Sequence, residues 1–188
     1  MSNRFVSGSF LTLFHLRWSV PVLAVFDEYG GQAKFVMVQR RLGASRTSLQ
    51  RTLGALVDMA LVRKNEGYGH PLRPEYLATE AGRLLGPAAR ALLTELERQD
   101  LTDVGLRKWS IPVLRALDGP SNQFNALQGA LGAITPRALS HALGDVEEAG
   151  WIQRRLQQTR PPRWEYGLLP KSEALTTAAG LLETKLSS

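Results

Sequence analysis

Residues 108–114 read KWSIPVL, and residues 17–23 read RWSVPVL. Both stretches follow one pattern, in which a basic residue precedes Trp, Ser, a β-branched residue, Pro, Val and Leu. Their tryptophans, Trp18 and Trp109, are separated by about half of the 188-residue chain. A Trp-anchored pattern that recurs at such a distance indicates an internal repeat, which decides how the rest of the sequence is interpreted.

The residues that follow each heptapeptide also correspond. Phe35–Ala44 aligns with Phe124–Ala133, and Glu75-Tyr76 aligns with Glu165-Tyr166, at nearly the same spacing as the tryptophans. Small insertions and deletions in turns account for the drift in spacing. The sequence therefore predicts one module duplicated in tandem, with a function that benefits from two copies. The apolar positions that correspond are Leu49, Leu53, Leu61 and Val62 in the first half and Leu139, Leu143, Trp151 and Ile152 in the second.

The first half shows the pattern of a helix-turn-helix. One helix begins at Trp18–Pro21, because proline is tolerated in a first turn, and it ends at Tyr29–Gly31. A second helix spans Phe35–Leu42 and stops before a glycine. A third is capped by Ser45 or Thr47 and carries a single apolar stripe at three- and four-residue spacing. Two short helices, a tight turn and a longer amphipathic helix together predict a helix-turn-helix.

A β-hairpin, the wing of a winged helix, is predicted to follow the third helix. Leu61–Lys64 has the pattern of a strand, Gly67–Gly69 marks a turn, and Arg73–Leu77 reads as the returning strand. Thr79 then caps a helix that runs to Leu96, contains a proline and joins the two halves. The second half repeats this order, with helices at 111–117, 124–131 and from Thr135-Pro136 to Gly150, a wing at 151–168 whose tip is near 160–162, and a closing helix at 175–186.

These elements predict a fold that is mainly α with small β-hairpin wings (α+β). Two tandem winged helix-turn-helix domains form an intrachain pseudo-dimer in this interpretation. Residues 1–80 form the first domain with an N-terminal segment, 81–104 a linking helical region, and 105–188 the second domain with its C-terminal helix. Each half is near the lower size limit for an independent core, so we expect the halves to pack together or to share a long helix.

Basic charge is concentrated in particular segments of the chain. The net charge is +6 and the isoelectric point is about 10.1. No acidic residue lies between Tyr29 and Val57, or between Ala149 and Trp164, whereas both stretches contain several arginines. Such segregation favours a polyanionic partner, with a merely solvated basic face as the alternative.

The remaining composition excludes several classes of site and location. The chain has no cysteine, which excludes disulfides, thiolate metal sites and thiol redox sensing. Residues 1–16 are apolar enough to dock on the body as a helix or strand, but too short to span a membrane. We find no membrane span and no signal peptide, so we expect a cytoplasmic protein, associated with the nucleoid when bound to DNA.

The second half resembles the HxlR-type winged helix-turn-helix transcriptional regulators of bacteria, which belong to the MarR-like superfamily. The resemblance rests on RPPRWEY at residues 160–166, on Phe124-Asn125 and on ITPRAL at residues 134–139. Leu143, Glu147, Gly150 and Trp151 fit the pattern that follows in the family, whereas the first half is more diverged. Family members usually carry one such module and dimerise, so the resemblance implies that the tandem chain is a covalent pseudo-dimer. Many also carry an N-terminal cysteine, which this chain lacks.

The third helix of each module is expected to enter the major groove of double-stranded DNA and to read base edges with its outward side chains. Each of these residues contacts either a base or a phosphate, and His141 is alternatively an ordinary exposed histidine. The candidates are Arg46, Thr47, Ser48, Gln50 and Arg51 in the first module and Thr135, Arg137, Ser140 and His141 in the second.

Basic residues of the wings are expected to contact phosphates or to enter the minor groove. Arg63 and Arg73 have a second possibility, since they can instead pair with Glu75 or another acid. The wing candidates are Arg63, Lys64, Arg154, Arg155, Arg160 and Arg163, together with Arg73. The aromatic residues at helix starts and in strands are interpreted as core residues, namely Trp18, Trp109, Phe35, Phe124, Tyr76 and Tyr166.

No phosphate loop, hydrolase motif or metal-ligand spacing occurs in the sequence. We therefore expect neither enzymatic activity nor a cofactor, and no small-molecule effector is indicated. Three functions remain open: a sequence-specific DNA-binding regulator, which we favour, a winged-helix protein-interaction scaffold, and a nucleic-acid-binding protein without sequence preference. One chain either covers both half-sites by itself or forms a homodimer through the apolar segment around Phe10 and Phe14.

Overall fold

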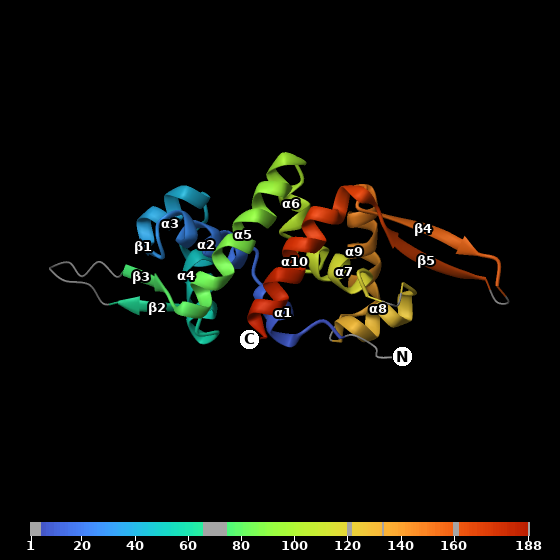
Figure 1. The fold of residues 1–188 in the computed structure, drawn as a ribbon, viewed down its shortest axis with the longest axis horizontal. Helices are drawn as coiled ribbons and strands as arrows, with labels where there is room; N and C mark the ends of the chain where they lie inside the picture. Colours follow the sequence, from blue (N-terminus) through green and yellow to red (C-terminus); the bar gives the residue numbers. More distant parts are fainter. Residues whose placement is uncertain (1–4, 66–74, 120–121, 133, 160–161, 188) are drawn as a thin grey trace.

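The computed structural model describes residues 5–65, 75–119, 122–132, 134–159 and 162–187. These residues are mostly helical and include two small antiparallel sheets. The molecule is elongated, with the two hairpins at opposite ends of its long axis and helices α5 (Glu80–Arg98) and α10 (Glu173–Leu186) between them (Figure 1). Its overall class agrees with the predicted mainly helical fold with β-hairpin wings.

The first half is built around α2 (Ser19–Glu28) and α5, which pack on each other. Strands β2 (Val62–Asn65) and β3 (Glu75–Ala78) pair antiparallel with Arg63 opposite Leu77. A short strand that the sequence did not predict, β1 (Gln32–Lys34), pairs with the other edge of β3. The remaining elements of this half are α1 (Gly8–Leu13), α3 (Phe35–Leu42) and α4 (Arg46–Asp58).

The second half has the same order of elements after a short additional helix. Helix α6 (Thr102–Gly105) was not predicted, and an isolated bridge between Gln123 and Glu165 stands where the first half has β1. Strands β4 (Ile152–Gln157) and β5 (Arg163–Leu168) form the second hairpin. The remaining elements are α7 (Ser110–Leu117), α8 (Phe124–Leu131), α9 (Pro136–Glu148) and a 3-10 turn at Pro170–Ser172 that leads into α10.

The predicted helix starts are found at their capping residues. The side chains of Ser45, Thr79 and Thr135 accept hydrogen bonds from the backbone N–H three residues later, at 3.1–3.2 Å. Ser45 is therefore the cap of α4, and Thr47 lies inside the helix. Gly43 ends α3 at φ 63°, in the left-handed region that favours glycine. The positions Gly67–Gly69, Arg73 and Arg160 lie outside the described residues.

Gly82 in the first turn of α5 allows this helix to approach the start of β2. A Cβ atom at Gly82 would lie 2.0 Å from the carbonyl oxygen of Leu61, a separation that no real Cβ atom tolerates. Thr79 Oγ1 donates to the backbone carbonyl of Ala60 at 2.7 Å in the same place. The absence of a side chain at Gly82 thus fixes the wing sheet of the first half against α5.

The six aromatic residues predicted for the core pack against it, but they are only partly buried. The fully buried positions are mostly aliphatic, and Trp151 is the largest side chain among them. Its indole Nε1 donates to Oε1 of Gln99 at 2.6 Å, and Nε2 of Gln99 donates to the carbonyl of Lys171 at 2.9 Å. The end of α5 is therefore bonded to the second half.

The N-terminal segment packs on the second half of the chain. Val6 N donates to the carbonyl of Ala130 at 3.1 Å, and Ser7 N donates to Glu183 Oε1 at 2.8 Å. Phe10 and Phe14 are 0% and 4% exposed, so the chain itself covers them. These two side chains therefore do not form the exposed apolar surface on which the alternative of a homodimer was based.

Candidate nucleic-acid interface

Helix α9 presents a polar face opposite its buried stripe. Thr135 caps the helix and Pro136 occupies its first turn, where the missing N–H of proline needs no partner. The side chains at 135, 137, 140 and 141 are all exposed, and α9 has no acidic residue before Asp145. The exposed candidates Thr135, Arg137, Ser140 and His141 therefore lie together over the first two turns. The stripe on the opposite side consists of Leu139, Ala142, Leu143 and Val146.

Helix α4 has the same division between a buried stripe and an exposed polar face. Arg46, Thr47, Ser48, Gln50 and Arg51 are exposed, whereas the stripe of α4 is buried. The guanidinium of Arg46 lies 5.9 Å from the ring centroid of Phe35, a cation–π distance that holds this side chain over the start of α3. Ser45 Oγ donates to Ser48 Oγ at 2.9 Å, so Ser48 is also engaged at the helix start.

The wing residues fall into two groups. Arg63, Lys64, Arg155 and Arg163 have exposed side chains. Arg154 is exposed as well, and in addition it forms an ion pair with Glu147 of α9 at 3.3 Å and lies over the ring of Trp164 at 5.1 Å. Pairing across the hairpin places Arg63 opposite Leu77 and not opposite Glu75.

A pair of basic residues beside tryptophans was missing from the predicted interface. Lys108 Nζ lies 4.8 Å from the ring centroid of Trp109, and the guanidinium of Arg17 lies 5.6 Å from that of Trp18. Both pairs belong to the repeated heptapeptide, which was interpreted only as a structural signal. Lys108 Nζ also lies 3.0 Å from His15 Nε2, so the starts of the two repeats meet here.

A shallow cavity of about 260 Å³ connects this region with the outward face of α9. It is lined by Trp109 and Ser110 at the start of α7 and by His141 and Asp145 of α9. Arg107 pairs with Asp145 at 2.6 Å, and this hydrogen-bonded carboxylate raises the pKa of the Arg107 guanidinium. The sequence signal that could have revealed this contact is the basic run before Trp109.

Comparison with known proteins identifies the family to which the second half of the chain is similar. The family described as HxlR-like helix-turn-helix matches residues 104–185, which run from before α7 to the last turn of α10. An uncharacterized HTH-type transcriptional regulator of Bacillus subtilis (strain 168), named YvaP, is 30% identical over 78 residues, which are 42% of this chain and 72% of YvaP. The chain belongs to the HxlR-like helix-turn-helix family.

Two further relatives match over a similar length. The uncharacterized HTH-type transcriptional regulators named YtfH from Escherichia coli (strain K12) and Shigella flexneri are each 27% identical over 75 residues. The match covers 40% of this chain and 60% of YtfH. HxlR-like proteins are helix-turn-helix transcription regulators and not enzymes, which agrees with the prediction that this chain is not an enzyme.

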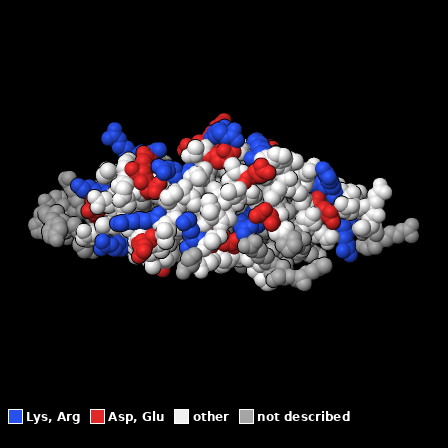
Figure 2. Space-filling view, viewed as in Figure 1, with Lys and Arg blue, Asp and Glu red and all other residues white. Residues whose placement is uncertain are grey.

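Helices α8 and α9 and the hairpin β4–β5 lie within the segment that matches the HxlR-like family. Residues 17–23 and the helix α4 lie outside the matched segment. Charge is mixed on the face seen in Figure 2, where Lys and Arg alternate with Asp and Glu over the middle of the molecule. The acid-free stretches of the sequence therefore do not make this face uniformly basic. The candidate DNA-binding residues are instead those that lie on α4, on α9 and in the hairpins.

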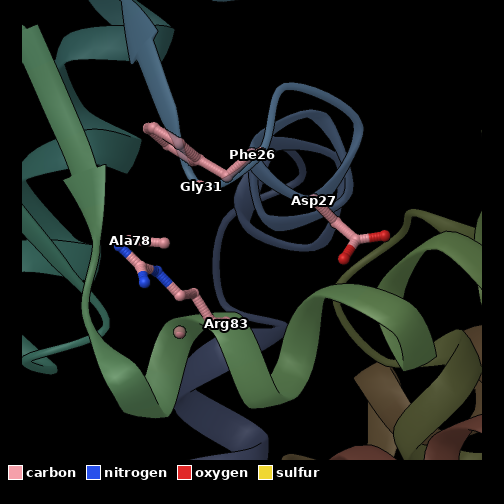
Figure 3. Close-up of a pocket in the computed structure, with 7 residues that line it drawn as sticks. Phe26, Asp27, Gly31, Ala78 and Arg83 are labelled. Atoms are coloured by element: carbon pink, nitrogen blue, oxygen red, sulfur yellow. The ribbon is translucent and has the colours of Figure 1, made fainter.

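A second cavity lies apart from the candidate residues. It measures about 180 Å³ between α2, the end of β3 and the start of α5, with Phe26, Gly31 and Ala78 in its lining. Figure 3 shows the Arg83 side chain reaching from α5 toward Ala78, while the carboxylate of Asp27 points away from it. That carboxylate instead forms an ion pair with Arg90 at 3.1 Å. The cavity contains none of the predicted DNA-binding residues.

The described residues contain no group of three potential ligands that could hold a metal ion. In the same part of the chain, no helix has the length and apolar character needed to cross a membrane.

Proposed function

We propose that this HxlR-like protein is a sequence-specific regulator of transcription that binds double-stranded DNA with two recognition helices, α4 and α9, in successive major grooves. The observation that carries the proposal is the exposed polar face at the start of α9, inside the family match, and its counterpart on α4. A major groove admits one helix, and guanidinium and amide side chains such as Arg137 and Gln50 can pair with two atoms of guanine or adenine.

The role of each residue in the interface follows from its side-chain chemistry and from its contacts in the structure. Residues on the outward faces of α4 and α9 read bases or hold phosphates at the groove edge. The exposed wing residues Arg63, Lys64, Arg155 and Arg163 contact the backbone, whereas Arg154 positions the wing against α9 through Glu147. Lys108, which lines the same cavity as His141 of α9, joins the interface as a phosphate contact.

The tandem arrangement is part of the proposal. Residues 1–80 and 105–188 act as two winged-helix domains in a covalent pseudo-dimer, and residues 81–104 link them. The packing of α5 on both α2 and α10 supports this reading, since a linker that also forms the central contact fixes the spacing of the two recognition helices. One chain then covers both half-sites, about one turn or roughly 34–36 Å apart. Because α4 and α9 differ in sequence, the site is an imperfect palindrome.

Selection of duplexes from a random pool, followed by competition against bulk DNA at fixed salt, tests the proposal. Enrichment of a single motif that outcompetes bulk DNA by about 10³-fold or more supports a specific regulator. Binding without enrichment indicates a protein that lacks sequence preference, and no binding to any duplex indicates a scaffold. The mass of the complex on a minimal selected site distinguishes one chain from two, and an obligate two-chain complex contradicts the pseudo-dimer. A cytoplasmic location belongs to this proposal.

A further inference from the structure

Two alanines of α9 leave a cavity between this helix and the start of α7. The two helices pack on each other (Figure 1), and the cavity measures about 260 Å³. Ala138 and Ala142 line it from α9, and Trp109 lines it from the residue before α7. Protein interiors are close-packed, so two methyl groups facing an indole leave space that larger side chains would fill. The cavity therefore results from the small residues that α9 carries here.

The first half of the chain has larger residues at the corresponding positions of α4. Ser48 and Thr52 align with Ala138 and Ala142. Thr52 is 1% exposed, and its Oγ1 donates to the backbone carbonyl of Ser48 at 2.9 Å. A threonine is thus compatible with this position of the third helix. The pair of alanines distinguishes the second module from the first.

Ser110 contributes a buried hydroxyl without a partner to the lining of the cavity. The residue is 1% exposed, and no group in the described part of the chain forms a hydrogen bond with its Oγ. Buried polar side chains in native proteins are nearly always hydrogen-bonded, so an unsatisfied one marks a place where a partner is expected to bind. The hydroxyl of Ser110 can donate to an acceptor that enters the cavity.

A cation without a carboxylate partner lines the same cavity. Lys108 Nζ lies 4.8 Å from the ring centroid of Trp109 and 3.0 Å from His15 Nε2, and among the described residues no carboxylate pairs with it. The other two charges of the lining compensate each other, because Arg107 and Asp145 form an ion pair at 2.6 Å. A hydrogen bond between ionised groups is stronger than one between neutral groups, so the cavity favours an anionic ligand.

We propose that the cavity between α7 and α9 binds a small ring carboxylate. Its ring would lie against Trp109 and the two alanines, and its carboxylate would accept from Lys108 Nζ and from the Ser110 hydroxyl. Ligand sites usually combine apolar walls with a few convergent polar groups. Drug-sized ligands occupy cavities of roughly 300 Å³ and more, so a cavity of about 260 Å³ suits a single ring. A bare phosphate ion would satisfy the polar groups but leave the apolar walls uncovered.

The site connects the ligand with DNA through residues that both would use. This step rests on the proposed DNA-binding function, in which Lys108 contacts a phosphate and His141, also in the lining, belongs to the recognition face. A carboxylate held by Lys108 neutralises the cation that otherwise meets the DNA backbone. Ligand and duplex therefore weaken each other's binding by the same factor. The ligand acts on the half of the chain that contains α9.

Calorimetric titration of the full chain with benzoate tests the site, with benzamide as the uncharged control. The wild type is expected to bind a single benzoate per chain, and to bind benzamide about tenfold more weakly because the amide lacks the charge. Ala142→Thr places the side chain of the first half in the cavity and should weaken benzoate binding by about tenfold or more. Ala91→Thr makes the same change at an exposed position of α5 and should bind benzoate like the wild type.

Ser110→Ala separates a ligand contact from a structural role. It should weaken benzoate binding by about tenfold, because one hydrogen bond to a charged group is lost. Its melting temperature should not fall, since the hydroxyl has no partner in the free protein. A lower melting temperature with unchanged benzoate affinity would assign the hydroxyl to the fold.

The effect on DNA is measured with the selected duplex. Saturating benzoate should raise the dissociation constant of the wild type for this duplex by about tenfold. S110A and A142T should bind the duplex like the wild type without benzoate, and should respond less to the same concentration of benzoate. Neither residue belongs to the proposed DNA contacts, so a changed response reports on the cavity.

Several results would overturn the inference. Absence of benzoate binding, or equal benzoate binding by the wild type and A142T, would show that the cavity holds no such ligand. Equal affinities for benzoate and benzamide would contradict the role of Lys108, and benzoate binding without an effect on the duplex would refute the coupling. In each case the wild type still selects its sequence, so the proposed function stands. A wild type that binds benzoate but no duplex refutes the proposed function and leaves the ligand site in place.

Discussion

The ion pair between Arg115 and Glu183 provides a sharp test of how the second half holds the N-terminal segment. The two side chains are 6% and 13% exposed, and Arg115 Nε donates to Glu183 Oε2 at 2.8 Å. The other carboxylate oxygen accepts the N–H of Ser7 at 2.8 Å. Glu183 therefore compensates a buried cation on α7 and at the same time holds the segment that leads into α1.

Glu183→Ala is expected to lower the free energy of unfolding by about 3–4 kcal/mol. Removing one partner of a buried pair costs roughly 3–5 kcal/mol, and the lower end applies because Asp118 remains 3.0 Å from Arg115. The lost hydrogen bond of Ser7 contributes about 1 kcal/mol. For a chain of this length, each kcal/mol corresponds to roughly 2–4 °C, so the melting temperature should fall by about 10 °C.

Thermal and urea unfolding of E183A measure this loss, and Glu28→Ala is the control. Glu28 pairs with Arg41 at 3.1 Å, but both side chains are about half exposed, so its removal costs about 1 kcal/mol or less. Amide exchange should show that Val6 and Ser7 lose protection in E183A alone. Equal losses in the two variants would refute the reasoning. Combining Arg115→Met with Glu183→Leu should recover most of the stability, since no charge is then buried without a partner.

Three further predictions follow from the contacts described. Arg155→Ala should weaken binding to all duplexes and lower the slope of the logarithm of the binding constant against the logarithm of salt concentration by about 0.9. Arg137→Ala or Gln50→Ala should instead change the preferred sequence. Arg154→Ala should lower the slope less than R155A, because Arg154 is already paired with Glu147. Gly82→Ala should lower the free energy of unfolding, measured with urea, by about 3 kcal/mol, because its Cβ would overlap the Leu61 carbonyl. No measurable loss would show that α5 can shift. Hydrogen bonds from Arg98 and Gln99 lower the pKa of Glu95 to about 2. The contribution of Glu95 to stability is therefore complete above pH 4.5 and is lost as the pH falls toward 2. Glu95→Gln should remove this part of the acid dependence of the free energy of unfolding, as measured at several pH values.

Much of the fold could be predicted because the signals are local. The caps at Ser45, Thr79 and Thr135 depend on residues within one turn, and the stripes of α4 and α9 depend on periodicity alone. Strand β1 could not be predicted, because three residues show no periodicity and form a strand only by pairing with β3. The docking of the N-terminal segment on α8 and α10 is likewise a tertiary contact.

The candidate interface shows the same limit. An apolar stripe predicts which residues of α4 and α9 face outward, so all candidates on these helices are exposed. It does not predict that Arg154 is engaged by Glu147, because these residues belong to different elements and meet only when the wing packs on α9. Lys108 was overlooked because its repeat with Arg17 was explained by the fold, although Lys108 also carries charge in the cavity that His141 of α9 lines.

Linking two modules in one chain, as we propose, changes which interfaces can evolve. In a homodimer related by a two-fold axis, every substitution appears twice, so both wings and both recognition helices must stay identical. In a single chain, the two recognition helices can differ in sequence, as Arg46–Arg51 and Thr135–Ser140 do. The same freedom allows the buried pair of Arg115 and Glu183 to hold the N-terminal segment on the second half alone. Divergence of the halves is then an expected consequence of the covalent link, and an asymmetric DNA site is its functional counterpart.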